Sequence, residues 1–245
     1  MIVETWQDFY SGTVRRNGYG ADGGMDSTAT SPEDATVAVA GDSNDRIISL
    51  SDGVFAFAMT LMVLQLRTPD PATTSPGELR ESITSQWPAL LSYGLTFYVI
   101  ATYWLVHHRL FRFIRGHDGG LVWMNVFFLF IISFLPFPTE IMGEYSDVSF
   151  ASAFYAISMA IASLMVTVMW LYVSHRPHLL VGPVTPGHFR YNLLRGIGVA
   201  TIFLVSAVIA QWSPAVARLF WLVLVPFHRI LAYLYRGSIG GSFYA

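Results

Sequence analysis

Residues 46–66 of the chain read RIISLSDGVFAFAMTLMVLQL, and between Ile47 and Leu66 the only ionisable side chain is Asp52. At about 1.5 Å per residue, a helix over this stretch is roughly 30 Å long, which matches the hydrocarbon core of a bilayer. A carboxylate within such a helix is costly and marks a candidate functional site. The stretch therefore predicts a membrane-spanning helix with a functional residue near its entrance.

The composition of the whole chain is typical of a polytopic membrane protein. Of its 245 residues, 53% are hydrophobic and 12% are charged, with a mean hydropathy of +0.49. An ordinary soluble domain has about 25% charged residues. Cysteine is absent and all 14 basic residues are arginine, which excludes disulfides, thiolate metal sites and lysine Schiff-base chemistry.

Further apolar stretches follow the first, and each is long enough to cross a bilayer. They cover residues 87–110, 120–141, 150–174, 191–211 and 214–235. We therefore predict an all-α membrane protein with six transmembrane helices in residues 46–236. Residues 1–45, which are rich in Gly, Ser, Thr and Asp, are predicted to form a disordered tail, and residues 237–245 a short C-terminal tail.

The placement of arginine predicts the orientation. If the helices alternate in direction, all arginines except Arg67, Arg80 and Arg218 fall on one side, so both termini are predicted to be cytoplasmic. The loops predicted on the other side carry acids instead. An ordinary solvated surface explains such acids, and attraction of cations is the alternative.

The first helix has a stripe of small, aromatic and hydroxyl side chains. Gly53, Phe57, Thr60 and Leu64 recur at helical spacing and share one face. Asp52 lies to one side of this stripe, where a buried carboxylate needs a partner or a proton. Arg46 and residues of the second and third helices are candidate partners for it. The stripe itself is compatible with close helix packing and with lining a pore.

Histidines are the other candidate functional residues. His107 and His108 end the second helix, and adjacent positions cannot face one partner because they differ by about 100°. One of them is expected to hydrogen-bond to Ser51, Asp52 or Asn125, unless both lie among lipid headgroups. The loop histidines at 175 and 178 have no further ligand at suitable spacing, so no metal site is predicted.

The motif Arg46-x-x-x-Leu50-Ser51-Asp52 resembles the Arg-x-x-x-Phe-Ser-Asp signature of the transmembrane protein 175 family, the endosomal and lysosomal potassium channels and their prokaryotic relatives. The likeness continues through the next two helices, in Trp104, His107, His108, Phe111, Asp118, Leu121, Trp123, Asn125 and the Leu-Pro-Phe-Pro-Thr turn at 135–139. The resemblance implies a homotetramer in a bacterial plasma membrane, with the first helix of each subunit lining a central pore.

The family resemblance also implies a function for the stripe. The chain resembles channels that select potassium weakly over sodium, and in these channels a hydrophobic constriction replaces a carbonyl-lined filter. Carried onto this chain, the constriction residues are Phe57, Thr60 and Leu64, with Gly53 also lining the pore. Two departures stand out: Leu50 replaces the signature phenylalanine, and Phe57 replaces the usual aliphatic residue. An aromatic ring there either closes the pore more completely or presents π faces to a cation.

Two other function classes are alternatives for such a chain. A membrane enzyme or haem protein needs histidines on facing helices, and the third and fifth predicted helices contain none. A proton-coupled secondary transporter or a proton-leak pathway using Asp52 is the stronger alternative, although transporter carboxylates usually lie nearer the midplane. The expected partners are lipid, monovalent cations such as potassium and further copies of the chain. Neither a cofactor, a metal nor nucleic acid is expected.

Overall fold

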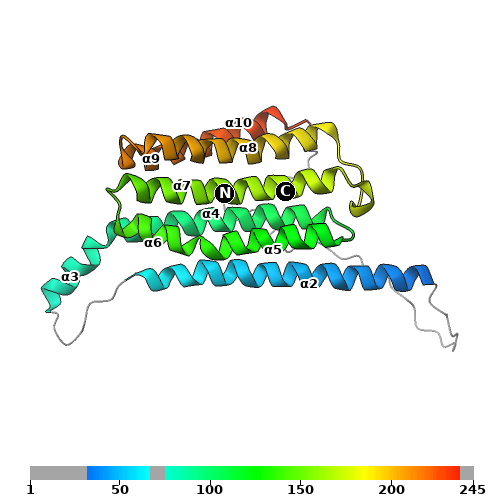
Figure 1. Ribbon diagram of the computed structural model, residues 1–245, viewed down its shortest axis with the longest axis horizontal. Coiled ribbons are helices and arrows are strands. Elements are labelled where there is room, and N and C mark those ends of the chain that lie inside the picture. Colours follow the sequence, from blue (N-terminus) through cyan, green and yellow to red (C-terminus); the bar gives the residue numbers. More distant parts are fainter. Residues whose placement is uncertain (1–31, 67–74, 238–245) are drawn as a thin grey trace.

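The computed structural model describes residues 32–66 and 75–237. Its long helices lie side by side in one bundle (Figure 1). Within the described residues, six helical segments are long and apolar enough to cross a membrane, which confirms the predicted all-α fold. They cover Asp45–Leu64, Ala89–Arg112, Gly119–Glu144, Ser149–Ser174, Pro186–Ile209 and Pro214–Leu234.

The first span belongs to helix α2 (Pro32–Leu61), which continues into a 3₁₀-helical turn at Met62–Gln65. This helix begins well before Arg46, so residues 32–45, which we had expected in the disordered tail, are helical here. The local sequence ATVAVA is rich in alanine, the strongest helix former, which favours extension of the helix. The remainder of the expected N-terminal tail lies outside the described residues, as does most of the C-terminal one.

Helix α3 (Pro76–Ser85) lies between the first two spans and was not predicted. The side chain of Ser75 accepts a hydrogen bond from the Glu78 backbone N–H at 3.4 Å, and Glu78 Oε2 accepts one from the Ser75 N–H at 2.7 Å. This reciprocal capping box satisfies two backbone donors at the start of the helix. The Ser-x-x-Glu spacing is visible in the sequence and could have identified the helix.

The second span is helix α4 (Trp87–Arg112), and the third consists of α5 (Gly119–Phe134) and α6 (Pro136–Glu144). The break between α5 and α6 falls in the Leu-Pro-Phe-Pro-Thr turn. Pro136 and Pro138 lack backbone N–H groups and therefore cannot continue the hydrogen-bond ladder of α5. The third span is thus a bent helix that ends later than the predicted residue 141.

Helix α7 (Ser149–Ser174) is the most buried span and packs most extensively on α8 (Pro186–Ile209). Small residues permit this close approach, as in other membrane helix pairs. A Cβ atom at Gly196 of α8 would lie 1.9 Å from Thr167 Oγ1 of α7, so no larger residue fits there without movement. A short 3₁₀ turn, Pro177–Leu179, follows α7.

The last span is divided into α9 (Pro214–Phe220), a 3₁₀ turn at Trp221–Val223 and α10 (Leu224–Leu234). Pro226 explains the division, because it cannot donate to the carbonyl of Leu222 in the preceding turn. Figure 1 shows α2 at one edge of the bundle, with α8, α9 and α10 at the opposite edge and α4 to α7 between them.

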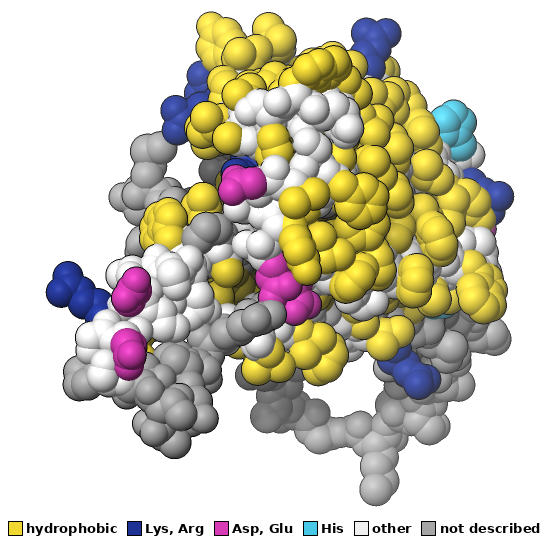
Figure 2. Space-filling model, turned by 60° about the vertical axis from the view of Figure 1, so that its left-hand side comes forward, with side chains coloured by type: hydrophobic (Ala, Val, Ile, Leu, Met, Phe, Trp, Pro, Cys, Tyr) yellow, Lys and Arg dark blue, Asp and Glu magenta, His cyan; other side chains and the backbone are white. Residues whose placement is uncertain are grey.

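Hydrophobic side chains cover much of the outer surface, while acidic side chains gather at the end that carries α3 (Figure 2). The exposed acids in this region belong to α3, to α6 and to the turn that follows it: Glu78, Glu81, Glu140, Glu144 and Asp147. An apolar belt between polar ends is the surface expected of a protein that spans a bilayer.

Candidate functional site

Helix α2 presents one face to the bundle, where it contacts α4 and α5. Ser51, Phe55, Ala58 and Met62 form this face, and each is at most 1% exposed. Their spacing follows the helical repeat, so they form a continuous buried stripe. The first helix is therefore fixed to the bundle along one line of side chains.

The opposite face of α2 carries the predicted pore-lining residues. Each of these residues lies two positions after a residue of the buried stripe; they are Gly53, Phe57, Thr60 and Leu64. Two positions on a helix turn by about 200°, so the two stripes lie roughly 160° apart. Phe57 is 63% and Leu64 is 75% exposed. A Cβ atom added at Gly53 would meet nothing within 4 Å. In the single subunit this apolar stripe is thus left uncovered.

Thr60 is the polar residue of the exposed stripe. Its hydroxyl donates to the backbone carbonyl of Phe57 at 3.0 Å, one turn earlier on the same helix. This bond uses the hydroxyl proton within the helix and directs the oxygen lone pairs away from it. A partly dehydrated cation on this face would therefore meet an oxygen acceptor between two apolar side chains.

A chain of buried polar groups joins α2 to α5 and α4. The amide nitrogen of Asn125 donates to Ser51 Oγ at 3.0 Å, and Asn125 Oδ1 lies 2.7 Å from His107 Nε2. The Ser51 hydroxyl in turn donates to the carbonyl of Ile47 at 2.8 Å. With the amide in this position, His107 Nε2 carries the proton and donates. The structure thus brings together three of the predicted network residues from three different helices.

Aromatic rings surround His107, which is 1% exposed. Its ring lies 4.4 Å from that of Phe111 and 5.6 Å from the rings of Phe55 and Phe128, measured between centroids. Phe55 and Phe128 were not predicted as part of the site. The position of Phe111 one helical turn after His107 was a usable signal, whereas the contacts from α2 and α5 depend on how the helices meet.

Asp52 binds a residue of the second span, one of the two helices expected to supply its partner. The indole N–H of Trp104 donates to Asp52 Oδ1 at 2.7 Å, so the carboxylate is tied to α4. Within the described residues, Arg46 makes no ion pair with Asp52. His108 lies beside Trp104, with 5.7 Å between ring centroids. Leu50 is 57% exposed, so it borders the open face of α2 rather than packing around Ser51.

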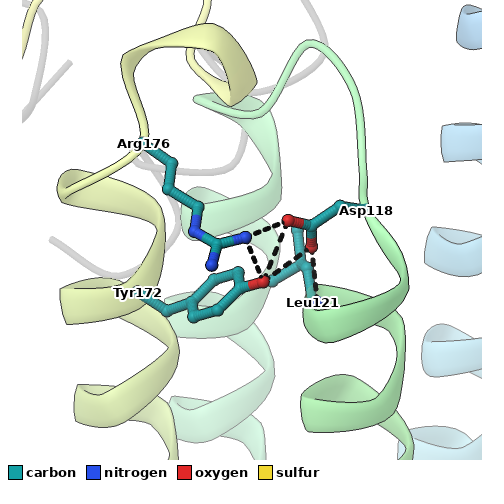
Figure 3. A network of polar contacts seen from close by, with 4 residues as sticks. All are labelled: Asp118, Leu121, Tyr172 and Arg176. Atoms are coloured by element: carbon teal, nitrogen blue, oxygen red, sulfur yellow. Dashed lines mark hydrogen bonds and ion pairs between the residues drawn. The ribbon is translucent and has the colours of Figure 1, made fainter.

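A second polar cluster joins the start of α5 to the end of α7 (Figure 3). Asp118 caps α5 by accepting from the Leu121 N–H at 2.8 Å, and it forms an ion pair with Arg176. The Tyr172 hydroxyl donates to the same carboxylate at 2.9 Å, and the Arg176 guanidinium lies over the Tyr172 ring. The pKa of Asp118 is lowered below its ordinary value. The largest cause is the hydrogen bond from the Leu121 N–H, and the contacts with Tyr172 and Arg176 lower it further.

Hydroxyl groups form a further buried contact near the other end of the bundle, which the sequence did not reveal. Thr96 of α4 donates to the Tyr155 hydroxyl of α7 at 3.0 Å, and Thr139 of α6 lies 3.2 Å from Thr96. In the part of the chain that the structure describes, no three His, Asp or Glu side chains are grouped closely enough to hold a metal ion. The hydroxyls of Thr96, Thr139 and Tyr155 therefore join α4, α6 and α7 to one another.

The fold and the two-faced first helix define a polytopic α-helical membrane protein with an anchored edge helix. A sequence profile of the endosomal/lysosomal potassium channel TMEM175 matches residues 46–136. A potassium channel of Streptomyces collinus is 32% identical over 138 residues, and one of Chamaesiphon minutus is 34% identical over 139 residues. Each match covers 55% of this chain and about two thirds of the relative, 66% and 68% respectively. The chain belongs to the TMEM175 family, a family of channels rather than enzymes.

More distant relatives and a solved structure complete the comparison. The human endosomal/lysosomal proton channel TMEM175 is 25% identical over 142 residues, which cover 56% of this chain and 27% of that protein. The crystal structure of a lysosomal potassium-selective TMEM175 homologue from Chamaesiphon minutus superposes with a TM-score of 0.67 at 24% identity. The superposition covers 77% of this chain and 97% of the homologue, so the two share a fold over nearly all of the homologue's length.

Proposed function

We propose that the protein is a potassium channel in which four copies of the chain surround a central pathway lined by α2. The observation that carries this proposal is the uncovered stripe of Gly53, Phe57, Thr60 and Leu64, opposite a face that is fixed to the bundle. The names of the bacterial relatives support potassium as the permeant ion. Bringing four such stripes together at one axis places the exposed aromatic and apolar side chains against one another.

The pathway narrows at side chains rather than at backbone carbonyls. An apolar ring of Phe57 and Leu64 excludes water, so an ion crosses it only when the ring widens and the pore becomes hydrated. The Thr60 oxygen between them replaces part of the lost hydration. Because partial ligation by hydroxyls compensates the smaller dehydration cost of potassium better than the larger cost of sodium, we expect potassium to pass best and sodium to pass poorly, with weaker selectivity than a carbonyl-lined filter provides.

The buried polar chain holds the pore helix in position. Ser51, Asn125 and His107 fix the rotation of α2, and the Trp104 bond keeps Asp52 off the axis. The ionisable residue of the first helix then acts by positioning, while its exposed neighbours meet the ion. We place the protein in the bacterial plasma membrane with the arginine-rich end and both termini in the cytoplasm.

Cysteine scanning tests the assignment of the pore helix, because the native chain has no thiols. Single cysteines at 49–64 are introduced, and channels in planar bilayers are treated with a charged methanethiosulfonate reagent. Modification at 53, 57, 60 and 64 should block current, whereas modification at 51, 55, 58 and 62 should not occur in the folded channel. Subunits are counted by native mass spectrometry. Reaction at the buried positions alone, or a dimer, would reject the proposed arrangement.

A proton pathway through Asp52 is the second candidate. The proton-channel name of the vertebrate relatives favours it, as does a half-buried carboxylate on the first helix. Reversal potentials in opposing potassium and proton gradients separate the two functions. A potassium channel follows the potassium gradient and keeps its current in Asp52→Asn channels that assemble, whereas a proton pathway follows the pH gradient and loses its current.

A further inference from the structure

A cavity of about 520 Å³ lies between α4, α7, α8 and α10, on the side of the bundle away from α2. Tyr98, Leu105 and Val225 belong to its lining and are exposed on the outer surface, so the cavity opens sideways from the bundle. No residue of α2 lines it. It is therefore separate from the proposed ion pathway.

The cavity is polar at one end and apolar at the other. Toward the arginine-rich end of the bundle, the cavity is lined by Arg109 of α4, Arg195 of α8 and Arg229 of α10. His228 also lies at this end. No Asp or Glu is present among the described residues that line it. Toward the bundle centre the lining consists mostly of apolar side chains, among them Val99, Phe203 and Leu224. One end of the cavity thus favours an anion, and the other an apolar chain.

The length of the cavity fits one leaflet of a bilayer. From Tyr98 to Arg109 the lining residues of α4 cover roughly 16 Å at the rise of an α-helix, and Leu110 and Phe113 continue the lining by about one turn toward the arginine-rich end. The hydrocarbon core of a bilayer is about 30 Å thick, so the cavity spans about half of it. Arg109 then lies near the depth of the phosphate groups, and the apolar end lies near the midplane. Arg195 and Arg229 lie deeper in their spans, and their long side chains extend from there toward the polar end.

We propose that this cavity binds an anionic phospholipid of the leaflet at the arginine-rich end. The phosphate contacts Arg109, Arg195 and Arg229, and one acyl chain follows α4 toward Tyr98. Guanidinium groups bind phosphate oxygens through paired hydrogen bonds, and basic pockets between transmembrane helices bind acidic headgroups. A zwitterionic lipid binds more weakly because its ammonium group approaches the same arginines.

Native mass spectrometry of the full-length channel tests the proposal with phosphatidylglycerol and phosphatidylcholine of identical acyl chains. The wild-type channel should retain phosphatidylglycerol preferentially. Each Arg→Gln substitution among Arg109, Arg195 and Arg229 should reduce that preference roughly fivefold, and the triple variant should lose it. The matched control is Arg112→Gln with Arg190→Gln. These two exposed arginines lie on α4 and α8 at the same end of the bundle but outside the cavity, so the control should keep the preference.

A second variant tests the apolar end without altering any charge. Val199→Phe fills the cavity and should lower phosphatidylglycerol retention while all three arginines remain, which also covers the case of a triple variant that does not fold. Inorganic phosphate at millimolar concentration should not displace the lipid. The proposal is overturned by equal retention of the two lipids, by an equal loss in the control variant, or by displacement with phosphate, which would indicate a site for free anions.

Discussion

Single buried hydrogen bonds determine how the first helix sits in the bundle. Asn125 is 2% exposed and connects Ser51 with His107, so replacing it leaves two buried polar groups without this partner. Interhelical hydrogen bonds in membranes contribute about 0.6 kcal/mol on average and up to about 1.7 kcal/mol. The structural role of Asn125 therefore has a measurable consequence.

We expect Asn125→Leu to destabilise the channel by about 1–2 kcal/mol, because the leucine cannot bond to either neighbour. The thermal midpoint of the detergent-solubilised channel, followed by size-exclusion chromatography, should fall. Ser49→Ala is the matched control, since the Ser49 hydroxyl is exposed and donates only to the carbonyl of Asp45 on its own helix. A midpoint that is unchanged in Asn125→Leu would remove this residue from the structural network.

The Asp118 carboxylate makes the stability of one end of the bundle depend on pH. Its pKa is lowered from 3.8 in the folded protein, first by the Leu121 N–H and also by Tyr172 and Arg176. Because its pKa is lower in the folded protein, the ionised Asp118 stabilises the folded state at pH values above the ordinary pKa. This contribution is lost as the pH falls through the folded-state pKa. Between about pH 5 and pH 3, the wild-type thermal midpoint should therefore fall more than that of Asp118→Asn. Parallel curves would contradict the assignment.

At the scale of the secondary-structure elements, the sequence determined the long helices and left their partners open. An apolar run such as 47–66 is sufficient to predict a span, because only a helix satisfies its backbone in lipid. The partner of Asp52 depends on the relative rotation of α2 and α4, which periodicity does not specify. The sequence therefore left Arg46 and residues of the second and third spans as candidates, and the structure selects Trp104 of α4. Likewise, the cavity of about 520 Å³ is formed by residues from four helices and has no local sequence pattern.

Helix α3 depends on its first turn, because it is short and mostly exposed. Replacing Ser75 with alanine removes the side-chain acceptor of the capping box and should cost about 1 kcal/mol of local helix stability. Hydrogen–deuterium exchange should then accelerate across α3 while α4 remains protected. The control is Ser85→Ala, because the Ser85 hydroxyl donates within the same helix near its other end. Equal acceleration in both variants would argue against the cap.

Conduction should depend on the side chains of the uncovered stripe of α2. Phe57→Ser replaces the largest side chain of the stripe with a small polar one, so the constriction should stay hydrated. Single-channel current should increase, and the permeability ratio of potassium to sodium, taken from bi-ionic reversal potentials, should decrease. Leu91→Ser is the control, since Leu91 is similarly exposed but belongs to α4. Unchanged conductance in Phe57→Ser would place this residue outside the pore.

At the scale of the whole molecule, the two ends of the bundle carry opposite charge. Exposed acids lie at the end with α3 and α6, whereas the arginines that line the cavity between α4, α7, α8 and α10 lie at the other. In the tetramer and orientation that we propose, these acids lie at the outer mouth of the pore. A ring of carboxylates there either concentrates cations near the entrance or only solvates the loops.

The dependence of current on ionic strength separates these two roles. Electrostatic screening extends over about 30 Å in 0.01 M salt but only about 3 Å in 1 M salt. If the acids concentrate potassium, replacing Glu81, Glu140 and Asp147 with their amides should reduce inward current in dilute potassium chloride and leave it nearly unchanged in concentrated solution. Outward current should change less, because those ions enter from the arginine-rich end. A reduction that is equal at both salt concentrations would indicate damage to the pore, and no reduction at either would mean that these acids only solvate the loops.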